Sequence, residues 1–283
     1  MGSSPIVVGV DGSASSRDAV RWAAGEASVR GDPLLLVSSV TTGGIGMASP
    51  FADDLRVSGE SALQDAVELA AEVGRVDAST EMVALTPVQA LMNHEGTARM
   101  IVLGTRGLGE FTGGLIGSVT SAIVHHAACP VVVVAGWPRP GEPAFDGPVV
   151  VGVDGTETSE PAVAAAFDEA TLHGADLVAL HAWSDRALPE GSVADTWTDI
   201  AAAEQHLLAE RLAPWREKHP SVSVKQVIVQ DRPARNLLMR GAGARLIVVG
   251  SRGRGGFHGM TLGSTSAALL RSTTIPLMVV RSH

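Results

Sequence analysis

The sequence of 283 residues has little cysteine, little lysine and no long apolar run. Its single cysteine, Cys129, rules out an intrachain disulfide and fits a reducing compartment. Only two lysines, Lys218 and Lys225, are present and the net charge is −9, which argues against nucleic-acid binding. No apolar run approaches the roughly 20 residues of a membrane helix, and the N-terminus lacks a signal-peptide pattern. We therefore expect a cytoplasmic protein with neither nucleic acid nor membrane as partner.

The first half of the sequence is repeated in the second half. Residues 6–13 (IVVGVDGS) return as residues 149–156 (VVVGVDGT). A glycine loop, Gly-x-x-Gly followed after nine residues by Gly-Ser, occurs at 104–118 and again at 250–264. A period this long indicates a duplicated domain rather than a solenoid. The sequence predicts domains at residues 1–137 and 147–283, joined by a proline-rich linker at 138–146.

Each repeat alternates short apolar strands with amphipathic helices. The first strand of each repeat is a continuous β-branched run, which is typical of a strand buried on both faces. Third strands are predicted at 222–229 and, from a weaker pattern, at 81–85. Five strands with helices between them predict an open, mostly parallel five-stranded α/β sheet in each repeat.

The helix ends and loops also show signals in the sequence. A serine-rich start at Ser13 is expected to cap the first helix, with Ser159 and Pro161 acting likewise in the second repeat. Gly31 and Gly174 are expected to end these helices. Segments 41–58 and 184–194, which follow the second strands, are predicted to be mobile loops, with helices following at about 59–73 and 196–218.

The repeated glycine loops predict an anion site. Glycine lets a ligand approach the main-chain N–H groups, and a helix that starts after Gly117 or Gly263 adds free donors and a positive dipole end. Asp11 and Asp154 follow the first strands, and the loops follow the fourth strands. Ligands of such sheets lie at the carboxyl ends of the strands, so each aspartate and its loop should converge on one crevice. Phosphate is the expected anion.

These motifs resemble those of the ATP-binding universal stress proteins, and the chain is similar to tandem, actinobacterial members over about residues 5–137 and 147–282. The resemblance implies a Rossmann-like domain of the adenine nucleotide alpha-hydrolase type, with one ATP in each repeat and Mg²⁺ as an option on the phosphates. It assigns residues beside the adenosine, a second-strand residue at adenine, a pair beneath the ribose and a phosphate cradle. In the first repeat these are Gly9, Val10 and Asp11; Ser39; Leu103 and Gly104; and Gly107, Gly117, Ser118, Val119 and Thr120. In the second repeat they are Gly152, Val153 and Asp154; Ala182; Val249 and Gly250; and Gly253, Gly263, Ser264, Thr265 and Ser266.

Some residues allow two interpretations. Arg106 and Arg252, inside the loops, are candidates either for a phosphate contact or for a salt bridge on the rim. Cys129 is expected to be buried and inert, and Trp183 is expected in the core or an interface. The first repeat departs from the family at Arg99, where an acidic residue is common, and at the 85–88 turn; both lie outside the cradle.

Other nucleotide enzymes fit the sequence poorly. A dinucleotide dehydrogenase needs G-x-G-x-x-G at the first turn, a P-loop needs a lysine that neither glycine loop contains, and a G-x-S-x-G elbow is absent. Two function classes stay open: a stress or energy-state regulator with at most weak ATPase activity, and a slow ATP hydrolase or phosphotransferase. The first is favoured, because no base or lysine is evident near the γ-phosphate.

Partners can also be anticipated from the sequence. Apolar runs that begin with proline, at 130–134 and 276–280, read as edge strands. Such edges tend to be paired, so packing of the two repeats and a homodimer are expected. A regulatory protein partner of unknown identity is expected as well.

Overall fold

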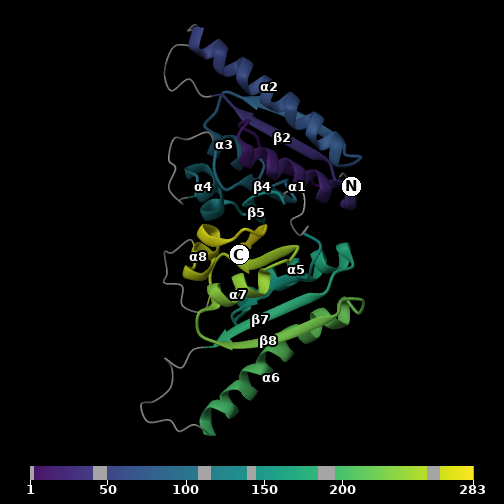
Figure 1. Ribbon diagram of the computed structural model, residues 1–283, viewed down its shortest axis with the longest axis vertical. Coiled ribbons are helices and arrows are strands. Elements are labelled where there is room, and N and C mark those ends of the chain that lie inside the picture. The colour runs from purple at the N-terminus through teal and green to yellow at the C-terminus, as the bar shows by residue number, and fades with distance from the viewer. Residues whose placement is uncertain are drawn as a thin grey trace. The chain divides into compact units, whose positions relative to one another are not determined.

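The computed structural model describes residues 3–40, 50–107, 116–138, 145–183, 195–253 and 262–282. The chain divides into two compact units, Met1–Arg139 and Pro140–His283, and each contains a set of parallel strands with helices between them (Figure 1). Among the helices in the described part of the chain, none combines the length and apolar character needed to cross a membrane.

The first unit is a parallel sheet of five strands in the order β3-β2-β1-β4-β5. Its strands are β1 (Ile6–Gly9), β2 (Leu34–Ser39), β3 (Ala78–Val83), β4 (Met100–Gly104) and β5 (Val131–Val134). Its helices are α1 (Ala14–Arg30), α2 (Pro50–Val73), α3 (Pro87–Met92) and α4 (Ser118–His126). Helices α1 and α2 pack on each other, as do α3 and α4. The chain order reverses at β1, which has β2 on one side and β4 on the other.

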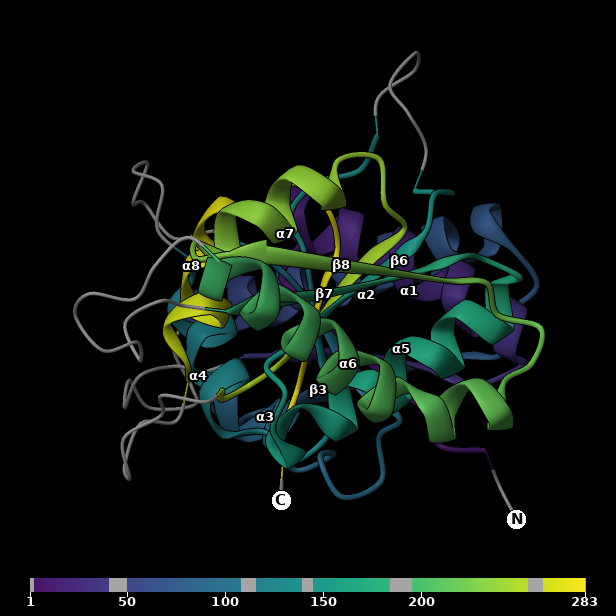
Figure 2. The ribbon, with the colours of Figure 1, turned by 90° about the horizontal axis from the view of Figure 1, so that it is seen from below.

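The second unit repeats this plan with the order β10-β9-β6-β7-β8, again parallel (Figure 2). Its strands are β6 (Val149–Val153), β7 (Leu177–Trp183), β8 (Val224–Gln230), β9 (Leu246–Gly250) and β10 (Leu277–Val280). Its helices are α5 (Glu160–His173), α6 (Asp195–Lys218), α7 (Pro233–Gly241) and α8 (Ser264–Ser272). The predicted α/β fold with mostly parallel sheets is therefore confirmed.

Burial explains why the central strands gave the clearest sequence signals. All residues of β4 and β9 are buried, as are the β-branched residues of β1, because helices cover both faces of a parallel sheet. Strand β3 lies at one end of its sheet and is mostly half-exposed or exposed. Its apolar pattern is therefore weak, and it begins at Ala78, three residues before the predicted start.

Helix α2 begins at Pro50, so the prediction of a loop through residue 58 was wrong for residues 50–58. Gly59 suggested a boundary, but it lies inside the helix. A Cβ at Gly59 would lie 3.2 Å from Val40 Cγ2 and 3.3 Å from Met82 Sδ, so glycine serves close packing there. The remaining predicted loop residues, 41–49 and 184–194, lie outside the described part of the chain.

The two first helices begin differently. Ser13 caps α1 as predicted, since its Oγ accepts a 3.1 Å bond from Ser16 N. The predicted cap at Ser159 was wrong: no side chain caps α5, and the Ser159 hydroxyl donates to Thr156 O at 2.9 Å. The chain enters α5 through a 3-10 turn at Glu157–Ser159, with Pro161 in the first helical turn. The residue that corresponds to Ser13 is Thr156, which donates its hydroxyl to Asp154 instead of accepting a bond from the helix N-terminus.

Several smaller expectations are confirmed. Gly31 and Gly174 end their helices in the left-handed conformation, with φ of 69° and 58°. Cys129 is buried, and burial raises the pKa of its thiol to about 11, which keeps it protonated and unreactive at neutral pH. Trp183 is buried in the second unit. Arg99 forms an ion pair with the buried carboxylate of Asp32, so its departure from the family pattern serves packing.

Candidate functional site

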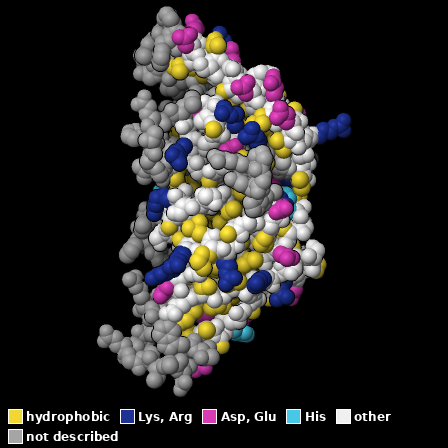
Figure 3. Space-filling model, in the orientation of Figure 1, with side chains coloured by type: hydrophobic (Ala, Val, Ile, Leu, Met, Phe, Trp, Pro, Cys, Tyr) yellow, Lys and Arg dark blue, Asp and Glu magenta, His cyan; other side chains and the backbone are white. Residues whose placement is uncertain are grey.

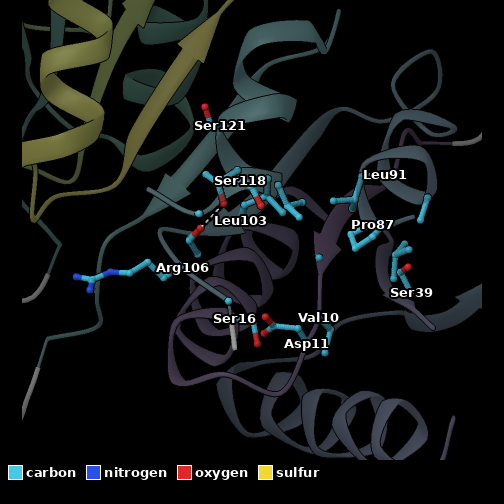
Figure 4. A pocket seen from close by; sticks show the side chains of 18 of the residues that line it. Val10, Asp11, Ser16, Ser39, Pro87, Leu91, Leu103, Arg106, Ser118 and Ser121 are labelled. Atoms are coloured by element: carbon cyan, nitrogen blue, oxygen red, sulfur yellow. Dashed lines mark hydrogen bonds between the residues drawn. The ribbon is translucent and has the colours of Figure 1, made fainter. Parts of the chain in front are cut away.

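Each unit has a cavity at the carboxyl ends of its central strands. The cavity of the first unit holds about 600 Å³ and lies where β1, β2 and β4 end (Figure 4). The cavity of the second unit holds about 410 Å³ at the ends of β6, β7 and β9. All eleven residues predicted for each site line the corresponding cavity. The sequence prediction thus names residues that the fold brings together, while nucleotide binding itself stays a prediction.

Each aspartate faces the glycine loop of its unit, as the strand arrangement predicted. A Cβ on Gly107 would collide with Asp11 Oδ2, and a Cβ on Gly253 would lie 3.3 Å from Asp154 Oδ2. The Asp11 Oδ1 atom accepts a 3.0 Å bond from Ser13 N. The first strand–helix turn and the glycine loop are therefore in contact and form adjoining walls of one crevice.

The carboxylate of Asp154 is held more extensively by its own turn. Its Oδ1 accepts 2.8 Å bonds from both the backbone N–H and the hydroxyl of Thr156. Its Oδ2 accepts a 3.2 Å bond from Thr158 Oγ1. These bonds fix the orientation of the carboxylate at the cavity wall.

Gly117 and Gly263 stand at the N-caps of α4 and α8, and no side chain in the described part of the chain caps either helix. Their φ angles, −58° and −72°, are open to any residue. A Cβ at either glycine would come no closer than 3.5 Å to another atom, which is ordinary contact. Neither backbone conformation nor packing against the described chain therefore requires glycine, and the first N–H groups of both helices face the cavity without a capping side chain.

Other glycines of the motif have a packing role. A Cβ on Gly104 would collide with Ser15 in α1, and one on Gly9 would lie 2.7 Å from Leu103 Cδ2. The loop ends are joined by backbone bonds, from Gly117 N to Thr105 O at 2.8 Å and its counterpart in the second unit at 2.7 Å. Some glycines, such as Gly104, are therefore required by close packing, whereas Gly117 and Gly263 are not.

The hydroxyls of the predicted phosphate cradle divide into two kinds. Thr120 donates to Gly104 O at 2.8 Å and Ser266 to Gly250 O at 2.7 Å, both in buried positions. These bonds tie the helices to the ends of β4 and β9, so these residues offer backbone N–H rather than hydroxyl protons to a ligand. Ser118 and Ser264, at the first helical position, are exposed and line the cavities.

The two loop arginines lie at the rims. Arg252 donates from Nη2 to Ser282 O at 3.1 Å, so it is tied to the C-terminal segment rather than to a carboxylate. Arg106 lines the first cavity, but its side chain extends away from the other labelled residues in Figure 4. A rim salt bridge at Arg252 is thus not formed with any described residue.

The sequence prediction missed an apolar wall in each cavity. Pro87, Ala90 and Leu91 of α3 line the first cavity, and Pro233 and Leu237 of α7 line the second. The signal was available as a proline-led short helix after the third strand. These side chains face the second-strand residue of each site, and Figure 4 shows Pro87, Leu91 and Ser39 close together. One end of each cavity is therefore apolar, while the other carries N–H donors.

Comparison with known proteins agrees with this arrangement. A model of the universal stress protein family matches residues 3–135 and 147–281. Universal stress protein Rv2005c of Mycobacterium tuberculosis is 41% identical over 288 residues, covering 98% of this chain and 96% of the relative. Universal stress protein Rv2623 of the same species is 39% identical over 289 residues, with the same coverage.

Solved structures show the same fold over the whole chain. The crystal structure of a universal stress protein from Archaeoglobus fulgidus has a TM-score of 0.71 at 20% identity and covers 99% of this chain, with 97% of its own length matched. The family model matches both halves of the chain, and the alignments with the mycobacterial relatives cover nearly the full length of both proteins. The chain therefore belongs to the universal stress protein family as a tandem pair of its domains.

Proposed function

We propose that each unit binds one adenine nucleotide, with ATP preferred, and that the protein acts as a stress or energy-state regulator. The observation that carries the proposal is the uncapped helix start behind a glycine that the fold does not require, present in both units. A helix start with free N–H donors attracts anions, and an absent side chain leaves room for phosphate oxygens.

The other end of each cavity suits a purine. Apolar side chains of α3 or α7 face the end of the second strand, which offers backbone groups to the edge of a base. The Ser39 hydroxyl donates to Leu85 O, so the backbone rather than this hydroxyl is the expected contact in the first unit. Asp11 and Asp154 lie between the two ends, where a carboxylate can accept bonds from ribose hydroxyls.

Magnesium fits as an ion carried on the phosphates. Among the described residues each cavity is lined by a single carboxylate, and Mg²⁺ typically takes one or two carboxylates together with phosphate oxygens and water. Both oxygens of Asp154 already accept bonds from its own turn. We therefore expect the phosphates and water, rather than protein side chains, to provide most of the coordination of Mg²⁺.

The side chains favour a binding role over catalysis. Among the described residues that line the cavities, the ionisable ones are one aspartate and one arginine in each unit. Phosphoryl transfer usually needs a base and several charge-stabilising groups, and binding alone gives affinity without rate. Slow ATP hydrolysis or phosphotransfer is the alternative. Single-turnover measurements with Mg²⁺ distinguish the two, because turnover of about 1–10³ per second would place the protein among enzymes.

The binding proposal is tested by identifying and counting the nucleotide. Denatured protein should release adenine nucleotide, detected by mass spectrometry, and calorimetric titration should approach two ATP per chain. Gly263→Glu should abolish binding in the second unit, because its carboxylate enters the phosphate position. Gly263→Ala is the matched control for folding, since the structure has room for its Cβ. Absence of binding at millimolar ATP would reject the proposal.

The remaining parts of the proposal concern location and partners. We infer that the protein works in the cytoplasm and transmits its nucleotide state to a regulatory protein. A homodimer through the final strands, β5 and β10, also stays a prediction. Substitution of Val279 by aspartate should disturb such an assembly, which light scattering would detect.

A further inference from the structure

Charge is distributed very unevenly along this acidic chain. From residue 231 to the C-terminus the sequence contains eight arginines and a single carboxylate, that of Asp231. The corresponding stretch of the first repeat, residues 85–137, has two arginines and two glutamates. The basic segment is therefore a property of the second unit and not of the repeat.

Four of these arginines are exposed on α7, on α8 or directly before α7, and their surface is here called the arginine face. Helices α7 and α8 contact each other, and the face consists of Arg232, Arg235, Arg240 and Arg271. Within the described ranges no carboxylate forms an ion pair with any of the four. Leu237 of α7 and Leu269 of α8 are buried, so the arginines occupy the outer sides of the helices. Met239, 57% exposed, stands among them.

Neither the fold nor the proposed nucleotide site explains the arginine face. The aligned positions of the first unit hold Thr86, Gln89, His94 and His125 in place of the four arginines. None of the four arginines lines the second cavity. Unpaired exposed guanidinium groups are well suited to bidentate contacts with carboxylates of another molecule.

A complementary acidic face lies on α2 of the first unit. Its exposed carboxylates are those of Asp53, Asp54, Glu60, Asp65, Glu68 and Glu72. Among the described residues, the ion pair from Arg56 to Glu60 is the only one formed by this set. Val57, 56% exposed, supplies an apolar residue within the face. Figure 3 shows the acidic side chains following α2.

We propose that two copies of this chain associate by contact of the acidic face on α2 of one copy with the arginine face of the other. Both faces are exposed helical surfaces of opposite charge, and each exposes one apolar residue, Val57 or Met239. Net charge of one sign would otherwise keep the copies apart, so the local complementarity both attracts and orients them. The contact is distinct from any pairing of the final strands.

Sedimentation velocity with charge-reversed variants tests the proposal. The wild type should associate more strongly at about 50 mM NaCl than at about 500 mM, where the screening length is only a few ångström. Arg235→Glu with Arg240→Glu should weaken self-association more than about tenfold, because it sets two acidic faces against each other. Asp65→Lys with Glu68→Lys should do the same through two basic faces.

Mixing the two double variants gives the decisive result. In the arginine-reversed variant both faces are acidic, and in the α2-reversed variant both faces are basic. Each variant therefore finds an oppositely charged face only on the other variant, so the mixture should form the complex that neither variant forms alone. Arg75→Glu and Glu217→Lys, which are exposed and outside both faces, are the matched controls and should behave as wild type. Wild-type association that is absent or does not depend on salt, salt-dependent association that survives reversal, or a mixture that associates no more than its separate variants would each overturn the proposal.

Discussion

The thiol of Cys129 lies in an environment that differs clearly from water. It lies between α4 and β5, is 8% exposed, and has a thiol pKa of about 11 because burial disfavours the thiolate. The ordinary pKa of a cysteine thiol, which we take for the unfolded chain, is 9.0. Between these values the unfolded state loses a proton that the folded state keeps, so the folded protein loses stability as the pH rises from 9 to 11.

We expect this residue to lower the free energy of unfolding by about 2 kcal/mol across that interval. Urea titrations at several pH values would measure it, with Cys129→Ala as the comparison. The background is small, because the sequence has no tyrosine and only two lysines to titrate in the same range. Parallel pH profiles of the wild type and Cys129→Ala would contradict the expectation.

At the residue scale, the sequence predicted where the glycines and aspartates of the site lie, but it did not predict which acceptors the hydroxyl groups bind. Asp11 and Gly107 could be placed together because both follow strands that end at the same edge of a parallel sheet. Ser266 was expected to offer its hydroxyl to phosphate but gives it to Gly250 O. A hydroxyl rotates to the nearest acceptor, and that acceptor depends on three-dimensional contacts that the sequence does not display.

At the scale of elements, the two repeats use the same position after the first strand for different purposes. Ser13 accepts from Ser16 N and caps α1, whereas Thr156 donates to Asp154 and orients the carboxylate. Sequence alone made these positions look alike, because serine and threonine serve as caps and as turn residues. The start of α2 was missed for a related reason, since Gly59 is a packing glycine inside the helix.

Substitution of these two residues should therefore have separate effects. Ser13→Ala should lower the unfolding free energy by about 1 kcal/mol, the usual cost of losing an N-cap. Thr156→Ala should change stability less and weaken ATP binding in the second unit by roughly five- to tenfold, the value of one hydrogen bond. Chemical denaturation and calorimetry measure the two quantities. Equal losses of stability would show that both residues act as caps.

At the scale of the whole molecule, duplication made the fold predictable. Two copies of each motif fixed the order of elements, and the buried β-branched strands gave the parallel sheet. The segregation of charge between α2 and the α7–α8 pair follows from positions where the repeats differ. A family motif describes what the repeats share, so such features appear only when the exposed faces are compared in three dimensions.

If each unit binds one ATP, each bound ATP should add its own increment to the free energy of unfolding. A ligand that binds only the folded state adds about 2.7 kcal/mol at one hundred times its dissociation constant. We expect ATP to raise the melting temperature of the wild type, and Gly117→Glu and Gly263→Glu each to remove the part that belongs to its own unit. Differential scanning calorimetry would measure these shifts. A full ATP effect in both variants would refute one site per unit.

The uncapped glycines at the starts of α4 and α8 have a consequence for protein engineering. Their extended backbone is the geometry in which serine, asparagine or aspartate makes a good N-cap, and the structure has room for the side chain. A thermostabilisation screen would therefore select such caps at Gly117 and Gly263. The new side chain would occupy the same N–H groups that a phosphate needs, so heat resistance would increase as ligand recognition declined. In this protein the residue that would best stabilise the helix start differs from the residue that best leaves its N–H groups open to phosphate.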